Sequence, residues 1–553
     1  MRTNFVLSSI LLLLFGVPLS WAIASITSSA FDIQAWQRFF ADPQTPKALA
    51  LTLWTGLAST LLSVGLAAWM LSRSFPGPTW SRLVRLLGPL LAVPHAAFAI
   101  GLVALIAPSG WLLRLVSPWA NGFMVPPAWA TTQDPWGLGL IAVLVAKEVP
   151  FLLWAAATQL QRADVAQRLA SEMNVARTMG YTFERAWWRV LWPQLWPRLR
   201  WPMLAVLTYG LTVVDVAMVI GPASPPTLAV LAWQWLLDAD LARNALGAVA
   251  AWWLAGMLAL TSSLLWFASR LSAWRRRWTS GQRGRSTQAR RNALMRSART
   301  ARAVALLPLP ALYGAVMLAL VIGSVSGVWA FPALVPQAFT TEAWTAVWGS
   351  SDTLGTTLTL GLASSLAALL WSVAWLECAP PRWDTVLRRF IYLPLVLPSV
   401  LWVVGVHAVA LRWGVDATWV GVWLAHTLAT VPYVLIALSP AYLGFDTRYW
   451  HISASLGKRR GVFLMQVKWP LLRAALAGAA AVGFAVSVAQ YLPTLFVGAG
   501  RFATVTTEAV TLASGAQRSL TSAYAVLQWL LPVLGFALAA WVGRPRKFAN
   551  RPT

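Results

Sequence analysis

The segment Asn174-Val175-Ala176-Arg177-Thr178-Met179-Gly180, followed by Val190-Leu191-Trp192-Pro193, lies between two long apolar runs. A second segment in the other half of the chain, His451-Ile452-Ser453-Ala454-Ser455-Leu456-Gly457 followed by Val467-Lys468-Trp469-Pro470, repeats its layout. Glycine and proline are 13 residues apart in both segments (193 − 180 and 470 − 457). One unusual spacing therefore occurs twice in a single chain, each time in a stretch that carries arginine or lysine.

The composition of the chain indicates a membrane protein. Of its 553 residues, 58% are hydrophobic and 11% are charged, whereas soluble domains average about 25% charged residues. This charge is too little to cover a surface that faces water. Apolar runs of roughly 20 residues, the length that crosses a bilayer as a helix, recur along the chain. The sequence therefore predicts an all-α polytopic membrane protein.

About twelve spans are expected from the apolar runs. They lie near residues 5–25, 49–71, 86–107, 137–158, 202–221, 246–268, 304–327, 354–376, 389–411, 419–440, 473–497 and 523–543. With both termini inside, the loops rich in arginine and lysine also fall inside, as the positive-inside rule requires. The net charge of +26 follows from this bias. It favours a multi-pass membrane protein over one that binds nucleic acid.

The two halves of the chain form an internal repeat. Gly56-Leu57-Ala58-Ser59-Thr60 matches Gly361-Leu362-Ala363-Ser364-Ser365. Three further pairs share an offset of 277 residues: Gly180 and Gly457, Gly221 and Gly498, Thr227 and Thr504. Because each half has an even number of expected spans, the halves should be parallel repeats about an axis along the membrane normal. The predicted domains are 1–269 and 303–553, joined by a basic cytoplasmic linker at 270–302.

The repeated segments predict two helical elbows on the inner side of the membrane. Residues 164–179 form a helix that Gly180 can end in the left-handed conformation. A second short helix, 182–192, runs to Pro193, which breaks continuity because proline lacks an N–H group. The stretch 449–470 repeats this layout. Such an elbow can dock in the groove of a partner, although one loop of this shape could also be merely structural.

These segments resemble the coupling loops of the permease subunits of ATP-binding-cassette (ABC) importers. The family's phrase is Glu-Ala-Ala, three residues, Gly, nine residues, Ile, one residue and Leu-Pro. Here Asn174 and His451 replace the glutamate, and Trp192 and Trp469 replace the leucine. The resemblance covers essentially the whole chain and implies two domains of the type I ABC importer permease fold. It assigns the ATPase-coupling loops to Asn174, Ala176, Gly180, Pro193, His451, Ser453, Gly457 and Pro470.

The resemblance also implies partners and a location. A permease of this kind sits in the bacterial inner membrane with both termini cytoplasmic, surrounded by the lipid bilayer. It works with an ABC ATPase, here in two copies, and with a periplasmic solute-binding protein. The chain has no Gly-x-x-x-x-Gly-Lys-Ser/Thr loop that could cradle ATP phosphates. We therefore expect no cofactor in this chain and ATP use by the partner. The solute stays open among iron, thiamine, polyamines and others.

Polar residues inside the expected spans are candidates for the solute pathway, because an ionisable group at membrane depth is costly. Lys147 and Glu148 lie in the fourth span, and Asp215 lies in the fifth. Gln490 and Tyr491 lie in the eleventh span, which matches the fifth. In this family the fourth and fifth spans of each half face the pathway. Lining the pathway and fixing the packing of helices are both open for these residues.

Two other classes of protein fit less well. A twelve-span secondary transporter driven by an ion gradient is the alternative, but the loop 72–85 lacks the Asp of the Gly-x-x-x-Asp-Arg signature common in such carriers. A membrane enzyme would need clustered catalytic or metal-ligating residues. The four histidines are scattered, Cys378 is the only cysteine, and no catalytic constellation is visible. We predict a transport permease with no catalytic residue and no metal site.

Overall fold

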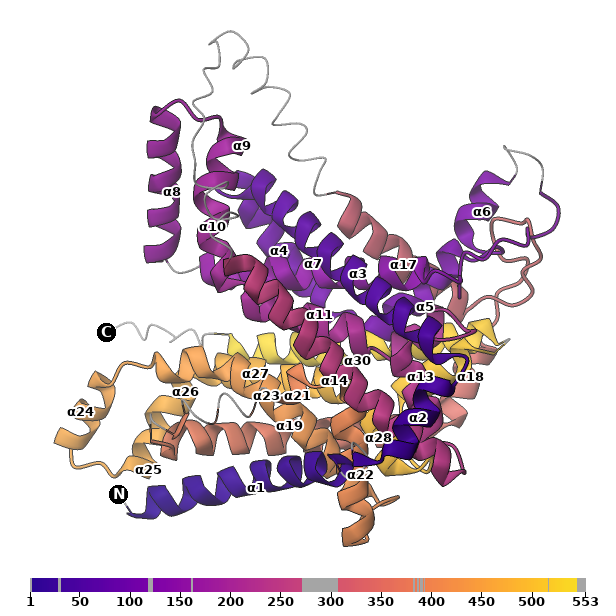
Figure 1. The fold of residues 1–553 in the computed structure, drawn as a ribbon. Helices are drawn as coiled ribbons and strands as arrows, with labels where there is room; N and C mark the ends of the chain where they lie inside the picture. The colour runs from indigo at the N-terminus through magenta and orange to yellow at the C-terminus, as the bar shows by residue number, and fades with distance from the viewer. Residues whose placement is uncertain are drawn as a thin grey trace. The chain divides into compact units, whose positions relative to one another are not determined.

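The computed structural model of the chain is built from helices (Figure 1). It describes residues 2–27, 31–117, 123–160, 163–270, 307–380 and 393–544 except 516, together with 383, 384, 387 and 391. Of the described residues, 80% are helical and none lies in a strand. Together with their apolar composition, these helices make the chain a polytopic all-α membrane protein, as predicted.

Eight helices of the described residues are long and apolar enough to cross a bilayer. They are α1 (Arg2–Thr27), α3 (Thr45–Ser74), α5 (His95–Ile106) with α6 (Trp111–Val116), α7 (Leu138–Leu160), α14 (Leu241–Arg270), α19 (Ser351–Cys378), α23 (Trp419–Leu443) and α30 (Arg518–Gly543). The helical segments Arg460–Leu471 and Arg473–Val488 are bent by 76° at the break between them. They count as a ninth span if they are taken together. The expected number of twelve therefore stays a prediction.

Breaks within the apolar runs explain the difference in number. The remaining runs hold shorter helices: α4 (Pro78–Ala92), α11 (Arg200–Thr212), α12 (Asp215–Ile220), α17 (Pro308–Ser324), α21 (Leu393–Val396), α22 (Ser399–Trp413), α27 (Arg473–Val488) and α28 (Leu492–Gly498). Pro94 and Pro398 each precede a helix, α5 and α22, because the proline ring fits a helix start and not its interior. Outside these runs lie α2 (Ile33–Ala41), α13 (Leu228–Leu236), α18 (Glu342–Gly349) and α29 (Val505–Ala513).

The chain divides into two compact units, and each unit combines segments that are far apart in the sequence. Unit 1 comprises Met1–Ser28, Glu342–Leu512 and Ala523–Thr553, and unit 2 comprises Ser29–Thr341 and Ala513–Ser522. Helix α1 thus packs on α22 and α19 of unit 1, and α17 packs on α5 of unit 2. The domain limits at 269 and 303 follow the sequence repeat and stay a prediction. Residues 271–302 of the linker lie outside the described residues.

Two equivalent glycines allow these packings. A Cβ atom on Gly405 of α22 would lie 2.0 Å from the carbonyl oxygen of Ala22 in α1. A Cβ atom on Gly101 of α5 would lie 2.6 Å from Val316 Cγ1 and 2.9 Å from its carbonyl oxygen in α17. The glycines are 304 residues apart (405 − 101), the same separation as Pro94 and Pro398. Small residues let membrane helices approach closely, so each unit uses the same device to hold the first helix of the other half.

The repeat is also visible in hydrogen bonds inside each unit. The Thr52 hydroxyl of α3 accepts from the N–H of Leu228, the first residue of α13, at 2.8 Å. The Thr357 hydroxyl of α19 accepts from the N–H of Val505, the first residue of α29, at 3.0 Å. Each threonine thus satisfies a donor that the helix itself leaves unpaired. The two halves therefore share contacts as well as sequence.

A buried histidine connects the two parts of the broken run α27–α28. His426 of α23 lies 2.8 Å from the Ser487 hydroxyl of α27 through Nδ1 and 2.8 Å from the Thr494 hydroxyl of α28 through Nε2. His426 is 1% exposed. These contacts hold both parts of the run against α23.

Replacing His426 by leucine, the residue at the equivalent position 144 (426 − 144 and 432 − 150 are both 282), is expected to destabilise unit 1 by about 1–2 kcal/mol. That is the range for two hydrogen bonds in a membrane protein. Thermal unfolding in detergent measures the effect. His451→Leu, at an exposed position, should leave the melting temperature unchanged, and an equal shift in both variants would contradict the assignment.

Candidate functional site

The expected elbows are present in both halves (Figure 1). The first elbow, residues 163–195, contains α8 (Ala163–Thr178), α9 (Phe183–Ala186), a π-helical turn (Trp187–Leu191) and α10 (Trp192–Leu195). The second elbow, residues 448–471, contains α24 (Arg448–Ser455), α25 (Arg460–Phe463), a π-helical turn (Leu464–Lys468) and α26 (Trp469–Leu471). The first follows α7 and leads to α11, and the second follows α23 and leads to α27. Each elbow is therefore joined directly to an apolar helix.

Both elbow glycines have the left-handed conformation that ends a helix. The φ angle is +91° at Gly180 and +70° at Gly457. The N–H of Tyr181 donates to the carbonyl of Ala176 at 3.2 Å, and the N–H of Lys458 donates to that of Ser453 at 3.0 Å. This six-residue closure is the Schellman motif, which favours glycine because a Cβ atom is strained at positive φ.

The π-helical turns are a shared feature that the sequence analysis missed. The turns at 187–191 and 464–468 are related by the same offset of 277 residues (464 − 187). In each, the N–H of the tryptophan before the proline donates five residues back: Trp192 to Trp187 and Trp469 to Leu464. The following Pro193 or Pro470 has no N–H for an ordinary helical bond. The Trp-Pro pair is thus the signal that could have predicted the wider turn.

The residues assigned to the coupling loops divide into a buried set and an exposed set. Ala176 and Ser453, one the counterpart of the other, are buried at 6% and 8% exposure. Asn174, His451, both glycines and Pro470 are exposed, and Pro193 is half-buried. The buried pair is not accessible to a partner, so the exposed set is what a partner could contact.

Each elbow also exposes an apolar pair at its tip. Val175 and Met179 are 59% and 72% exposed in the first elbow, and Ile452 and Leu456 are 58% and 70% exposed in the second. The members of each pair are four residues apart, a spacing that places side chains on one face of a helical segment. Exposed apolar groups rimmed by polar ones mark interaction sites. We call Val175 with Met179 and Ile452 with Leu456 the apolar pairs.

A buried tryptophan and an ion pair attach the first elbow to the end of α3 in unit 2. Trp187 is fully buried and donates from its indole N–H to the carbonyl of Phe75 at 3.1 Å. Arg73 at the end of α3 forms an exposed ion pair with Glu184 at 3.1 Å. Within the elbow, hydrogen bonds from Gln194 and Arg168 hold the pKa of Glu172 below its usual range, which keeps this carboxylate charged between α8 and α10.

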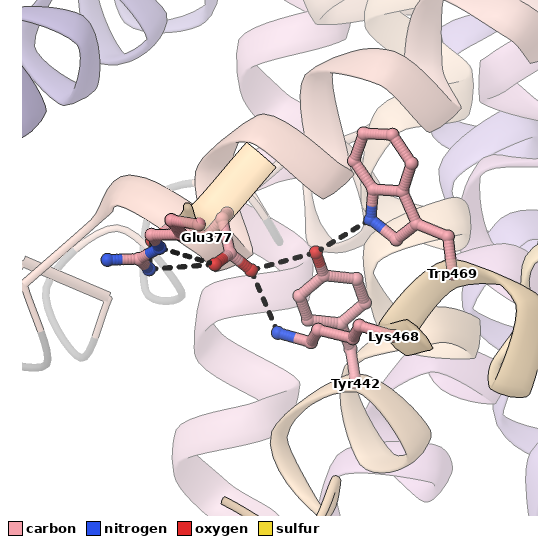
Figure 2. A network of polar contacts seen from close by, with 5 residues as sticks. Glu377, Tyr442, Lys468 and Trp469 are labelled. Atoms are coloured by element: carbon pink, nitrogen blue, oxygen red, sulfur yellow. Dashed lines mark hydrogen bonds and ion pairs between the residues drawn. The ribbon is translucent and has the colours of Figure 1, made fainter. Parts of the chain in front are cut away.

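The second elbow is attached to unit 1 by a network around Glu377, the penultimate residue of α19 (Figure 2). Its Oε1 atom accepts from Arg460 at 2.7 Å and 3.2 Å. Its Oε2 atom accepts from Lys468 at 2.8 Å and from the Tyr442 hydroxyl at 2.9 Å. The Trp469 indole N–H donates to that hydroxyl at 3.3 Å. We call these five residues the Glu377 network; none of them is among the functional residues predicted from the sequence.

Three of the candidates for the pathway lie at breaks between helices, and the fourth, Glu148, lies beside the first residue of α5. Asp215 is the first residue of α12, and Gln490 and Tyr491 lie between α27 and α28. Glu148 of α7 is 6% exposed and lies 3.3 Å from Nε2 of His95, the first residue of α5. His95 also interacts electrostatically with Asp215. The structure therefore brings Glu148 and Asp215 near one histidine that the sequence analysis recorded only as scattered.

Lys147 has a structural role at the break between α4 and α5. Its ammonium group donates to the carbonyl of Leu90 at 3.2 Å and to that of Val93 at 2.5 Å. These carbonyls lack helical partners because α4 ends at Ala92 before Pro94. Lys147 thus satisfies the end of α4. Among the described residues, no group of three or more His, Cys, Asp or Glu side chains could hold a metal ion.

Comparisons with known proteins bear on the whole chain. No protein-family model matches it. It is 36% identical over 540 residues to the inner membrane ABC transporter permease protein YnjC of Escherichia coli strain K12. The alignment covers 96% of this chain and 95% of that protein.

Proposed function

The chain belongs to the inner-membrane ABC transporter permeases, and we propose that it is the transmembrane subunit of an importer that a separate ABC ATPase drives through the two elbows. The observation that carries this proposal is the repetition of one elbow geometry. Both copies have the same glycine closure, π-helical turn and apolar pair at one offset in sequence. Two matching surfaces in one chain suit two copies of one ATPase.

The proposed cycle follows from this arrangement. The apolar pairs insert into a groove on each ATPase copy at the cytoplasmic side, with both termini of the chain on that side. ATP binding and hydrolysis occur in the ATPase, since the chain contains no phosphate-binding loop of its own. A periplasmic binding protein delivers the solute. Differential binding of these partners shifts the permease between outward-open and inward-open states, and we propose Glu148, Asp215, Gln490 and Tyr491 as pathway residues.

A charge placed in each apolar pair tests docking without disturbing the glycine closure. We expect Val175→Asp combined with Ile452→Asp to weaken binding of the ATPase by about 30-fold at each elbow, since each change removes an interface anchor worth roughly 2 kcal/mol. Detergent-solubilised wild type and variant are compared by quantifying the ATPase that each retains. Gln167→Lys, at an exposed position two turns earlier in α8, is the control and should retain it.

The outcomes separate the rival functions. Loss of the ATPase in the double variant and not in the control supports coupling through the elbows. Retention in both variants would show that the ATPase docks elsewhere. If wild type retains no ATPase under conditions that preserve membrane complexes, the importer proposal fails, and uptake driven by an ion gradient becomes the function to test.

A further inference from the structure

The two elbows are attached by different chemistry at equivalent positions. Lys468 corresponds to Leu191 by the 277-residue offset. Glu377 corresponds to Ser72 by the offset that relates Gly361 to Gly56 (377 − 72 and 361 − 56 are both 305). Tyr442 corresponds to residue 160, a leucine, by the offset of 282 that relates Pro432 to Pro150 (442 − 160). The first half therefore has two leucines and a serine where the second half has a carboxylate, a phenol and an ammonium group.

The Glu377 network joins three elements at one point (Figure 2). Glu377 ends α19, Tyr442 lies at the end of α23, and Lys468 belongs to the π-helical turn of the second elbow. The side chains of Glu377 and Lys468 are each 13% exposed. The ammonium group also lies 3.9 Å from the centre of the Tyr442 ring. Hydrogen bonds between charged groups are directional, so this network resists sliding of the elbow along α19 and α23.

The corresponding positions in the first half lack such directional contacts. Leu191 is fully buried, and the residue at position 160 is 4% exposed. Ser72 donates to the carbonyl of Trp69 in its own helix. The ion pair in this region, Arg73 with Glu184, is exposed at 30% and 64%, and exposed pairs contribute little because water screens them. The first elbow keeps the buried hydrogen bond from Trp187 to the carbonyl of Phe75, so the contrast between the two halves is confined to these three positions.

We propose that Glu377 is a positioning residue that makes the second elbow, α19 and α23 move as one body. The ATPase copy docked at the second elbow would then move α19 and α23 together with that elbow. This inference rests on the proposed function, because it concerns how a docked ATPase moves the permease. It concerns the transmission of movement and not the docking surface, since the apolar pair of the second elbow lies outside the network.

Spin labels on the second elbow and on α19 test whether the two move together. With Cys378 replaced by serine, labels are placed at exposed Ser455 of α24 and exposed Leu362 of α19. Distances are measured in the complex with the ATPase, without nucleotide and with ATP and vanadate. In wild type we expect one distance in both states. In Glu377→Gln we expect a nucleotide-dependent shift of about 2 Å, the scale of element movements in packed proteins.

A second variant covers the case in which Glu377→Gln does not fold. Glu377→Ser, Tyr442→Leu and Lys468→Leu together give the second half the residues of the first half. Replacing a buried ionic group by apolar residues is often neutral for stability. The triple variant should fold, retain the ATPase and show the same nucleotide-dependent shift. Arg73→Gln, at the exposed pair of the first elbow, is the matched control and should leave the distance in the second half constant.

Each outcome tests either this inference or the proposed function. A constant distance in folded Glu377→Gln or in the triple variant overturns the inference, as does a nucleotide-dependent shift in wild type. Variants that bind the ATPase as wild type does and still show the shift support it. Absence of the ATPase from wild type defeats the proposed function instead, and co-purification detects that before any distance is measured.

Discussion

Replacing Gly405 by valine is expected to destabilise unit 1 by roughly 3 kcal/mol or more, at the upper end of the cost of overpacking. The Cβ atom alone would lie 2.0 Å from the Ala22 carbonyl oxygen. That atom belongs to the backbone of α1 and cannot rotate away, so the whole helix must move off α22. Because α1 packs on both α22 and α19, we also expect misassembled protein that binds no ATPase.

Thermal unfolding and size-exclusion profiles in detergent check this prediction. Gly16→Val is the control, because it lies on the same helix α1 and a Cβ atom there would meet nothing within 4 Å. It should behave as wild type. Gly101→Val should have a smaller effect than Gly405→Val, because the nearest backbone atom there, the Val316 carbonyl oxygen, would lie farther away, at 2.9 Å. Equal melting temperatures for Gly405→Val and Gly16→Val would show that the close approach is not needed.

Replacing Arg114 by methionine is expected to release the loop at 329–333 from α6. Arg114 is 3% exposed, and its guanidinium group donates to four carbonyls: Ser109 at 2.8 Å, Ala330 at 2.9 Å, Ala333 at 2.5 Å and Trp329 at 3.1 Å. It also stacks on the Trp329 ring at 4.5 Å. Leaving several carbonyls unsatisfied costs about 1–3 kcal/mol each, so we expect a local loss of roughly 3 kcal/mol or more.

Limited proteolysis reports this local loss better than global unfolding does. In the Arg114 variant, cleavage within 325–341 should become at least tenfold faster, because opening of this loop no longer breaks the hydrogen bonds to Arg114. Arg243→Ala is the control. Its ion pair with Asp238, at 3.0 Å, is exposed at 62% and 30% and should contribute almost nothing. Slow cleavage in both variants would mean that other contacts hold the loop.

The elbows could be predicted from sequence because their conformation is set locally. A glycine that must adopt positive φ and a proline that lacks an N–H constrain the backbone whatever packs around them. The helix expected at 164–179 is α8, and Gly180 and Gly457 have the expected conformation. The role of the exposed elbow residues depends on a partner, so it stays a prediction.

The number of spans and the role of single charges were harder to predict, because both depend on long-range partners. Hydropathy detects the apolar runs but not the break at Pro94, where a span becomes two helices. Lys147 appeared as a pathway candidate because it is charged at membrane depth. Its partners, the carbonyls of Leu90 and Val93, lie 57 and 54 residues earlier in the chain, and no spacing within α7 points to them.

By itself, the sequence determined that the chain is a helical membrane protein with an internal repeat and two elbows, because apolar length, glycine and proline act over a few residues. Tertiary structure decided that α1 packs with the second half and α17 with the first, through Gly405 and Gly101. It also decided that Glu377 meets Tyr442 and Lys468, 65 and 91 residues away. Such contacts depend on which helices approach within a few ångström, and that is set by the packing of the whole unit.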